Sequence, residues 1–131
     1  MHITNSYSEM FTAIAKAADI SVKPWIHSVV PINVGDDKIL INEDSEDYFL
    51  RIESRDTNGE RFPENDIELE IYKSGNDVNI MLSWSSGNKD LILWQGSHSF
   101  WMNAEEGIRC SAPPDSSAFE SLARRIRALL N

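Results

Sequence analysis

Residues 66–102 constrain the fold more than any other part of the chain, because apolar residues recur there at every second position. In 67–72, Ile67, Leu69 and Ile71 alternate with acidic or amphipathic residues, and 78–84 repeat the pattern up to Trp84. A period of two predicts strands with one buried face. Glycine-containing turns at 73–77 and 85–88 join these strands as hairpins.

The next predicted strand, 91–94, breaks the alternation. Leu91 and Leu93 fall on one face, and Ile92 and Trp94 fall on the other, so both faces are apolar. Such a strand needs cover on both sides, from the protein's own helices or from a partner. A Gly-Ser-His-Ser break at 96–99 follows, and 100–102 either continue an edge or form a short seventh strand.

Three further strands are predicted before this region, at 25–30, 38–41 and 48–53. Pro31 cannot donate to a ladder, so the first of them ends there or lies at a sheet edge. A long polar segment, 54–65, contains Gly59 and Pro63 and is expected to be a loop. Short connections between strands predict an antiparallel meander of about six strands.

One amphipathic helix is predicted at each end of the chain. The first begins with a capping box of Ser6 and Glu9 and ends near residue 18 or 19; the second begins with a capping box of Ser117 and Glu120. Each has an apolar stripe at spacings of three and four. The stripes are Tyr7, Met10, Phe11, Ile14 and Ala18, and then Phe119, Leu122, Ala123, Ile126, Leu129 and Leu130.

These elements predict a single α+β domain spanning residues 1–131. We expect an N-terminal helix, an antiparallel meander sheet of about six strands that is strongly curved or barrel-like, and a C-terminal amphipathic helix packed on the sheet. The length of 131 residues suits one domain.

The formal net charge of −9 is concentrated in residues 36–70, which hold thirteen acidic and four basic residues. An acidic surface repels phosphate backbones and anionic lipid, so we expect no nucleic-acid and no membrane partner. No apolar run reaches the roughly 20 residues that span a bilayer. The single cysteine, Cys110, fits a reducing compartment, and we expect a cytoplasmic protein.

Motifs for catalysis and cofactor binding are absent from the sequence. There is no phosphate-binding glycine loop, no histidine or cysteine spacing typical of metal sites, and no nucleophile elbow. The acidic segment 42–47 lacks the glycine and distal glutamate of a calcium loop. Cys110 follows Arg109, but no base marks it as a nucleophile. We therefore predict no catalytic residues, no metal site and no cofactor.

The surplus of aromatic and methionine side chains near residues 94–102 indicates binding instead. Trp, Met and aromatic residues are enriched at the centres of protein interfaces. The predicted partner-contact residues are Trp94, Phe100, Trp101 and Met102. An alternative is an apolar pocket between a helix and the curved sheet, near Trp84, Trp94 and His98.

The sequence therefore favours a small acidic interaction or assembly-factor domain without catalytic activity, which binds a protein partner or a second copy of itself. The alternative function is a small-molecule-binding domain that uses the apolar pocket. An enzyme that uses Glu68, Glu70 or His98 is the third and least favoured hypothesis. The sequence does not identify the partner or the ligand.

Overall fold

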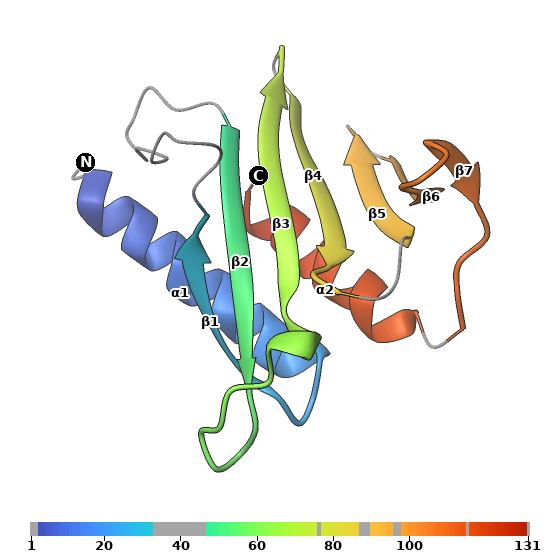
Figure 1. Ribbon diagram of the computed structural model, residues 1–131. Coiled ribbons are helices and arrows are strands. Elements are labelled where there is room, and N and C mark those ends of the chain that lie inside the picture. Colours follow the sequence, from blue (N-terminus) through green and yellow to red (C-terminus); the bar gives the residue numbers. More distant parts are fainter. Residues whose placement is uncertain are drawn as a thin grey trace.

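A computed structural model describes residues 3–32, 47–75, 77–86, 90–95, 98–114 and 116–130. Along the chain, one α-helix precedes the strands and one follows them, and a short 3-10 helix, η1, precedes the third strand (Figure 1). The elements are α1 Ile3–Ser21, β1 Ile26–Pro31, β2 Asp47–Arg55, η1 Pro63–Asn65, β3 Ile67–Ser74, β4 Asp77–Trp84, β5 Asp90–Gln95, β6 His98–Asn103, β7 Ile108–Cys110 and α2 Ser117–Leu129.

The seven strands form one antiparallel sheet whose spatial order follows the sequence from β1 to β7. The predicted α+β fold is therefore confirmed, with a meander sheet between two helices. The sheet is curved but does not close into a barrel, since β1 and β7 are its two edges in the part of the chain described. Pro31 lies in edge strand β1, where its missing N–H is tolerated.

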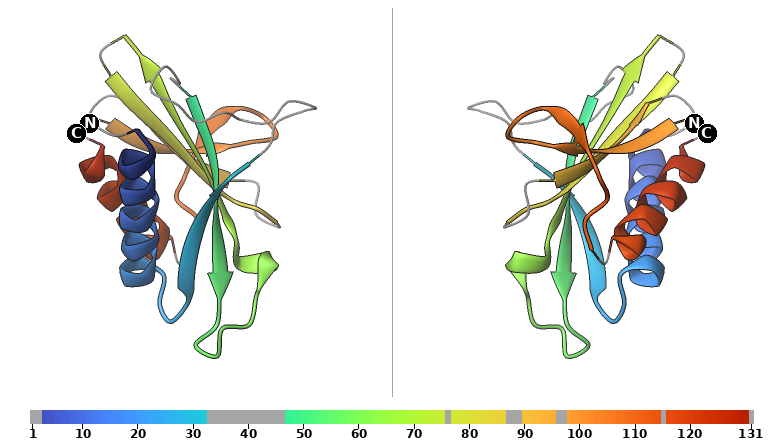
Figure 2. Two further views of the ribbon diagram at one scale, coloured as in Figure 1. Left: turned by 90° about the vertical axis from the view of Figure 1, so that its left-hand side faces the viewer. Right: turned by 90° about the vertical axis from the view of Figure 1, so that its right-hand side faces the viewer.

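Both helices pack on the same face of the sheet (Figure 2). Alternate aliphatic residues of β2, β3 and β4 point toward the helices and form the core with Ile14 of α1 and Leu122 and Ile126 of α2. Ala17 and Ala18 are also buried, and their short side chains allow the helices and the sheet to approach closely. The period-two pattern of the sequence thus describes the helix-facing side of the sheet correctly.

A row of three aromatic rings holds α2 against the strands. The Phe119 ring stacks between Trp84 of β4, at 4.8 Å between centroids, and Trp101 of β6, at 5.9 Å. Stacked aromatic pairs add roughly 0.5–1.5 kcal/mol beyond the area that they bury. This contact fixes the position of α2 over β4–β6.

The predicted helix starts are wrong. Helix α1 begins at Ile3, so Ser6 lies within it, and it continues to Ser21. Helix α2 has Ser116 at its N-cap position, with no capping hydrogen bond from that side chain. Glu120 does not reach back to close a capping box with Ser117, because its carboxylate accepts a hydrogen bond from the indole of Trp101.

Several strand predictions change as well. Strand β7 was not predicted; it has only three residues and pairs with β6 after a turn at Gly107. The break predicted at 96–99 is shorter, because β6 already begins at His98. Within the segment predicted as a loop, β2 continues to Arg55 and η1 forms. The predicted strand 38–41 lies outside the described residues.

Candidate functional site

The face of the sheet opposite the helices, which we call the open face, is the candidate functional site. Strand register shows which side chains share it, because residues that pair directly across antiparallel strands point to the same side. One row across the sheet consists of Phe49, Glu70, Met81, Leu93 and Phe100. The adjacent row consists of Val30, Arg51, Glu68, Ser83, Leu91, Met102 and Arg109.

The half of the open face on β2 and β3 carries most of its charge. Asp47 and Glu53 on β2 share this face with Glu68 and Glu70 on β3. Arg51 pairs with Glu68 at 3.7 Å, but both side chains are about 40% exposed or more, so the pair contributes little to stability. The carboxylates leave this half with an excess of negative charge.

Glu70 differs from the other carboxylates of this half. Its cross-strand neighbours are Phe49 and Met81, and its side chain forms no hydrogen bond or ion pair with another described residue. Burial raises the pKa of Glu70 above its usual value, and the nearby Asp47 raises it further. The ionised Glu70 carboxylate is therefore held beside apolar groups, and no cation among the described side chains balances its charge.

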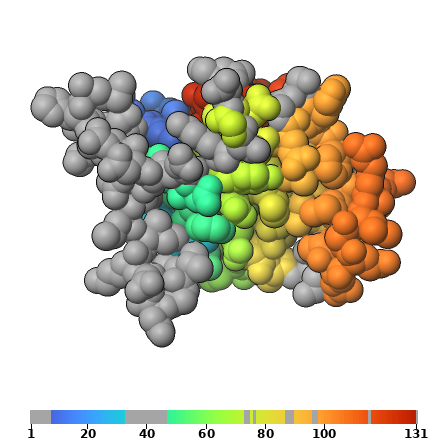
Figure 3. Space-filling model, turned by 90° about the horizontal axis from the view of Figure 1, so that it is seen from above, coloured from blue at the N-terminus to red at the C-terminus, as the bar shows by residue number. Residues whose placement is uncertain are grey.

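The half of the open face on β4–β6 is apolar. Met81, Phe100 and Met102 are partly exposed, whereas Leu91 and Leu93 are only 6% and 7% exposed. The guanidinium of Arg109 lies over the Phe100 ring at 4.4 Å from its centroid, a cation–π contact. In the view from above, β5–β7 (orange) form the end of the sheet farthest from α1 (Figure 3).

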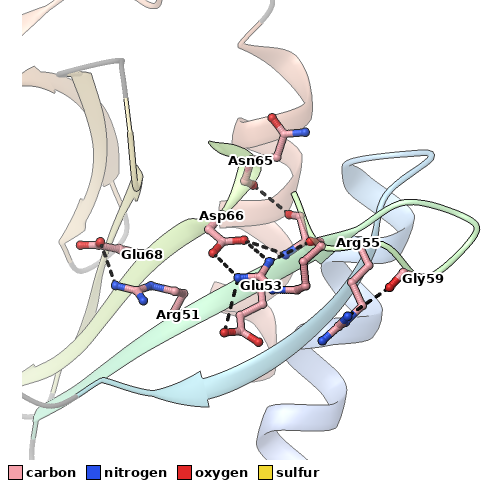
Figure 4. A network of polar contacts seen from close by, with 9 residues as sticks. Arg51, Glu53, Arg55, Gly59, Asn65, Asp66 and Glu68 are labelled. Atoms are coloured by element: carbon pink, nitrogen blue, oxygen red, sulfur yellow. Dashed lines mark hydrogen bonds and ion pairs between the residues drawn. The ribbon is translucent and has the colours of Figure 1, made fainter. Parts of the chain in front are cut away.

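A partly buried ion pair anchors the segment between β2 and β3 at one end of the open face (Figure 4). Arg61 forms two parallel hydrogen bonds with Asp66, each 2.9 Å, and also lies 3.6 Å from Glu53. The backbone N–H of Ser54 donates to Asp66 at 2.8 Å. The charged half of the open face thus ends in a fixed, fully paired network.

Opposing effects set the pKa of Asp66. Burial favours the neutral acid, but the hydrogen bonds from Arg61 and from the Ser54 N–H, together with the positive charges of Arg61 and Arg51, outweigh it. The net result is a lowered pKa, so Asp66 is ionised at neutral pH. This pairing joins residues five apart and across a turn, and no sequence pattern marked it.

The structure divides the predicted contact residues between the two faces. Phe100 and Met102 lie on the open face, while Trp94 and Trp101 face the helices. Trp101 is 7% exposed and its indole N–H donates to Glu120, so it is part of the core. Their role in binding a partner stays a prediction.

The residues of the predicted pocket do not come together. Trp84 stacks on Phe119, whereas His98 is exposed on β6 and pairs with Gln95 on the open side. Trp94 does line a cavity of about 240 Å³ between α2 and strands β5 and β6. On the helix side that cavity is lined by Arg124 and by Glu120, which the sequence had suggested only as a helix-capping residue.

The residues considered for catalysis are spread over the sheet. Glu68 is paired with Arg51, Glu70 lies beside Met81, and His98 is an exposed residue of β6. Burial and the charge of Asp90 raise the pKa of the Cys110 thiol, which opposes the thiolate form. No group of three or more metal-ligating side chains occurs in the part of the chain that is described, and most of the acidic segment 42–47 lies outside it.

Among the described residues, neither helix is long and apolar enough to cross a membrane.

Comparison with known proteins identifies the family but not the activity. A family model described as a domain of unknown function, DUF8659, matches residues 11–129, which include the C-terminal half of α1, the whole described sheet and α2. The chain therefore belongs to this family. No curated protein and no solved structure matches the chain significantly.

Proposed function

We propose that this protein is a non-catalytic interaction domain whose open face binds a basic segment of a partner protein. The observation that carries the proposal is the position of Glu70, a carboxylate without a partner among the described residues, between Phe49 and Met81. It stands where the charged half of the open face meets the apolar half.

A lysine or arginine side chain of a partner matches this position chemically. Its methylene groups cover apolar side chains while its charged end forms a hydrogen-bonded pair with a carboxylate. The pKa of Glu70 is raised in the free protein, so a cation placed beside it relieves an unfavourable charge. Apolar residues next to that cation in the partner would then lie against Met81, Phe100 and Met102.

The charge of the chain supports a basic protein partner over other macromolecules. The chain carries a net charge of −9, and the open face of β2 and β3 is rich in carboxylates. Such a surface attracts a basic segment and repels nucleic acid and anionic lipid. A cytoplasmic setting, suggested by the single cysteine, is part of the same proposal.

Charge reversal at Glu70 tests the proposal. Wild type and Glu70→Lys would be used in parallel to capture partners from the native cell, and captured proteins would be tested as purified pairs by calorimetry. We expect a partner with an exposed basic segment that binds wild type and is lost, or bound at least tenfold more weakly, with Glu70→Lys. Binding should also weaken as salt concentration rises.

Glu9→Lys is the matched control, because Glu9 is an exposed residue of α1, on the opposite side of the sheet, and the charge change is the same. This control should bind like wild type. A partner that binds all three proteins equally would contradict the proposal. Association of the chain with itself, if lost with Glu70→Lys, would instead assign the open face to a dimer.

A further inference from the structure

The cavity on the other side of the sheet, between α2 and strands β5 and β6, has walls of two kinds. Ile92, Trp94 and Trp101 form an apolar wall on the strands, and Glu120 and Arg124 contribute opposite charges from α2. Its volume of about 240 Å³ lies just below the roughly 300–1,000 Å³ of sites for drug-sized ligands. The cavity therefore suits a ligand no larger than a single amino acid.

Glu120 is held in place by Trp101. The Trp101 indole N–H donates to Oε2 of Glu120 at 2.9 Å, and the indole itself is fixed by stacking on Phe119. A carboxylate has two oxygens that accept hydrogen bonds, so one oxygen remains available. No cation among the described residues pairs with Glu120.

Arg124 follows Glu120 by one helical turn and is exposed at the cavity. Side chains four apart on a helix are close enough to form an ion pair directly. Here they do not: within the described chain Arg124 has no ion pair, and Glu120 is turned to the indole. The cavity thus presents a fixed negative group and a free positive group beside an apolar wall.

We infer that this cavity binds a small zwitterion, specifically a free α-amino acid with an apolar side chain. The ammonium group is bound by the free oxygen of Glu120, and the carboxylate accepts hydrogen bonds from the guanidinium of Arg124. The apolar side chain packs against Trp94 and Ile92. A peptide terminus carries only one of the two charges, which distinguishes a free amino acid from a protein segment.

This site lies on the helix side of the sheet, whereas Glu70 lies on the open face; of the residues named for the proposed protein-binding surface, Phe100 alone also lines the cavity. It also gives the small-molecule alternative raised by the sequence a definite location, at Trp94 but away from Trp84 and His98. Failure of either assignment leaves the other intact.

Titration with matched ligands tests the inference. Leucine, methionine and phenylalanine would be added to the ¹⁵N-labelled protein, with 3-methylbutylamine and 4-methylpentanoate as analogues of leucine that lack one charged group. We expect saturable binding of at least one amino acid, with a shift of the Trp101 indole N–H signal in the NMR spectrum. Each singly charged analogue should bind at least tenfold more weakly than leucine, because one charge-assisted hydrogen-bonded contact is lost.

Two substitutions each remove one of the two charges and leave the cavity in place. Glu120→Gln keeps an oxygen that accepts from the Trp101 indole, and Arg124→Gln changes an exposed residue, so both should fold, which thermal unfolding would verify. Each should weaken amino-acid binding about tenfold or more. Arg125→Gln removes the same charge from a neighbouring exposed position that does not line the cavity, and should bind like wild type.

The inference fails if no amino acid binds saturably up to about 10 mM, a limit that detects dissociation constants in the millimolar range. It also fails if either singly charged analogue binds as tightly as leucine, or if Glu120→Gln and Arg124→Gln bind like wild type.

Discussion

The two halves of the open face share one backbone geometry but differ in how far their side chains are exposed to water. On β2 and β3, charged residues such as Arg51 and Glu68 point away from the helices and remain in water, about 40% exposed or more. On β5, Leu91 and Leu93 point the same way and are almost completely buried. The difference lies in the side chains alone, since the antiparallel ladder continues through both halves.

Strand β5 is apolar on both faces, and the protein itself covers both of them. Helix α2 covers Ile92, Trp94 and their neighbour Trp101 on one side. On the other side the chain itself buries Leu91 and Leu93, whose cross-strand neighbours include Met81, Phe100 and Met102. A partner is therefore not required to cover this strand. Partner recognition fits better at the boundary between the halves, where Glu70 lies beside Met81.

The largest effect is expected from truncating the apolar half. Leu93→Ala should lower the free energy of unfolding by about 2–4 kcal/mol, because a buried leucine loses its contacts and leaves a cavity. The matched change in the charged half, Glu68→Ala, should change it by less than about 0.5 kcal/mol. Urea denaturation measures both. Similar values for the two variants would show that Leu93 is no more important to stability than a solvated charged residue of the same face.

An intermediate effect is expected at the end of the charged half. Asp66→Asn should cost about 2–3 kcal/mol at pH 7, because the charge-assisted hydrogen bonds from the half-buried Arg61 to the buried Asp66 carboxylate are lost. Glu64→Gln, at an exposed position of η1, serves as the control and should be nearly neutral.

The stability that Asp66 contributes should decrease at acid pH. The pKa of Asp66 is lowered in the folded protein, so its contribution is fully present above the unfolded pKa of about 3.9 and is lost as pH falls through the lower folded value. The difference between wild type and Asp66→Asn should shrink in that acid range. A difference that is independent of pH would contradict the role of the ion pair.

The smallest change in stability is expected for Glu70, at the boundary between the two halves of the open face, and it should be a stabilisation. Glu70→Gln should stabilise the free protein at pH 7, by only a few tenths of a kcal/mol because water still screens this side chain. The pKa of Glu70 is raised in the folded protein. The contribution of its carboxyl group to the stability of the wild-type protein is therefore fully present below the unfolded pKa of about 4.3 and is lost as pH rises through the folded value. The gain from Glu70→Gln should therefore vanish below about pH 4. Melting temperatures across this pH range, with Glu105→Gln as an exposed control, measure the effect; destabilisation at pH 7 would contradict it.

Local patterns predicted most of the fold and little of the site. Alternation at 67–72 and 78–84 predicted β3 and β4 and their buried faces, and the stripe from Phe119 to Ile126 predicted the buried face of α2. Strand β7 was missed because three residues are too few to show a period. The start of α2 was predicted wrongly because Ser117 and Glu120 match a capping box, whereas a distant indole bonds with the glutamate.

The sequence by itself determined which residues share a face of each element, because side-chain direction repeats with the local backbone period. It also determined the acidic character of 36–70 and the apolar character of both faces of β5. Only the tertiary structure decided that Trp101 lies under α2, that Arg61 joins Asp66, and that Glu120 and Arg124 line one cavity with Trp94. These contacts depend on which side of the sheet the helices cover and on the strand register, and both follow from packing between residues far apart in the chain.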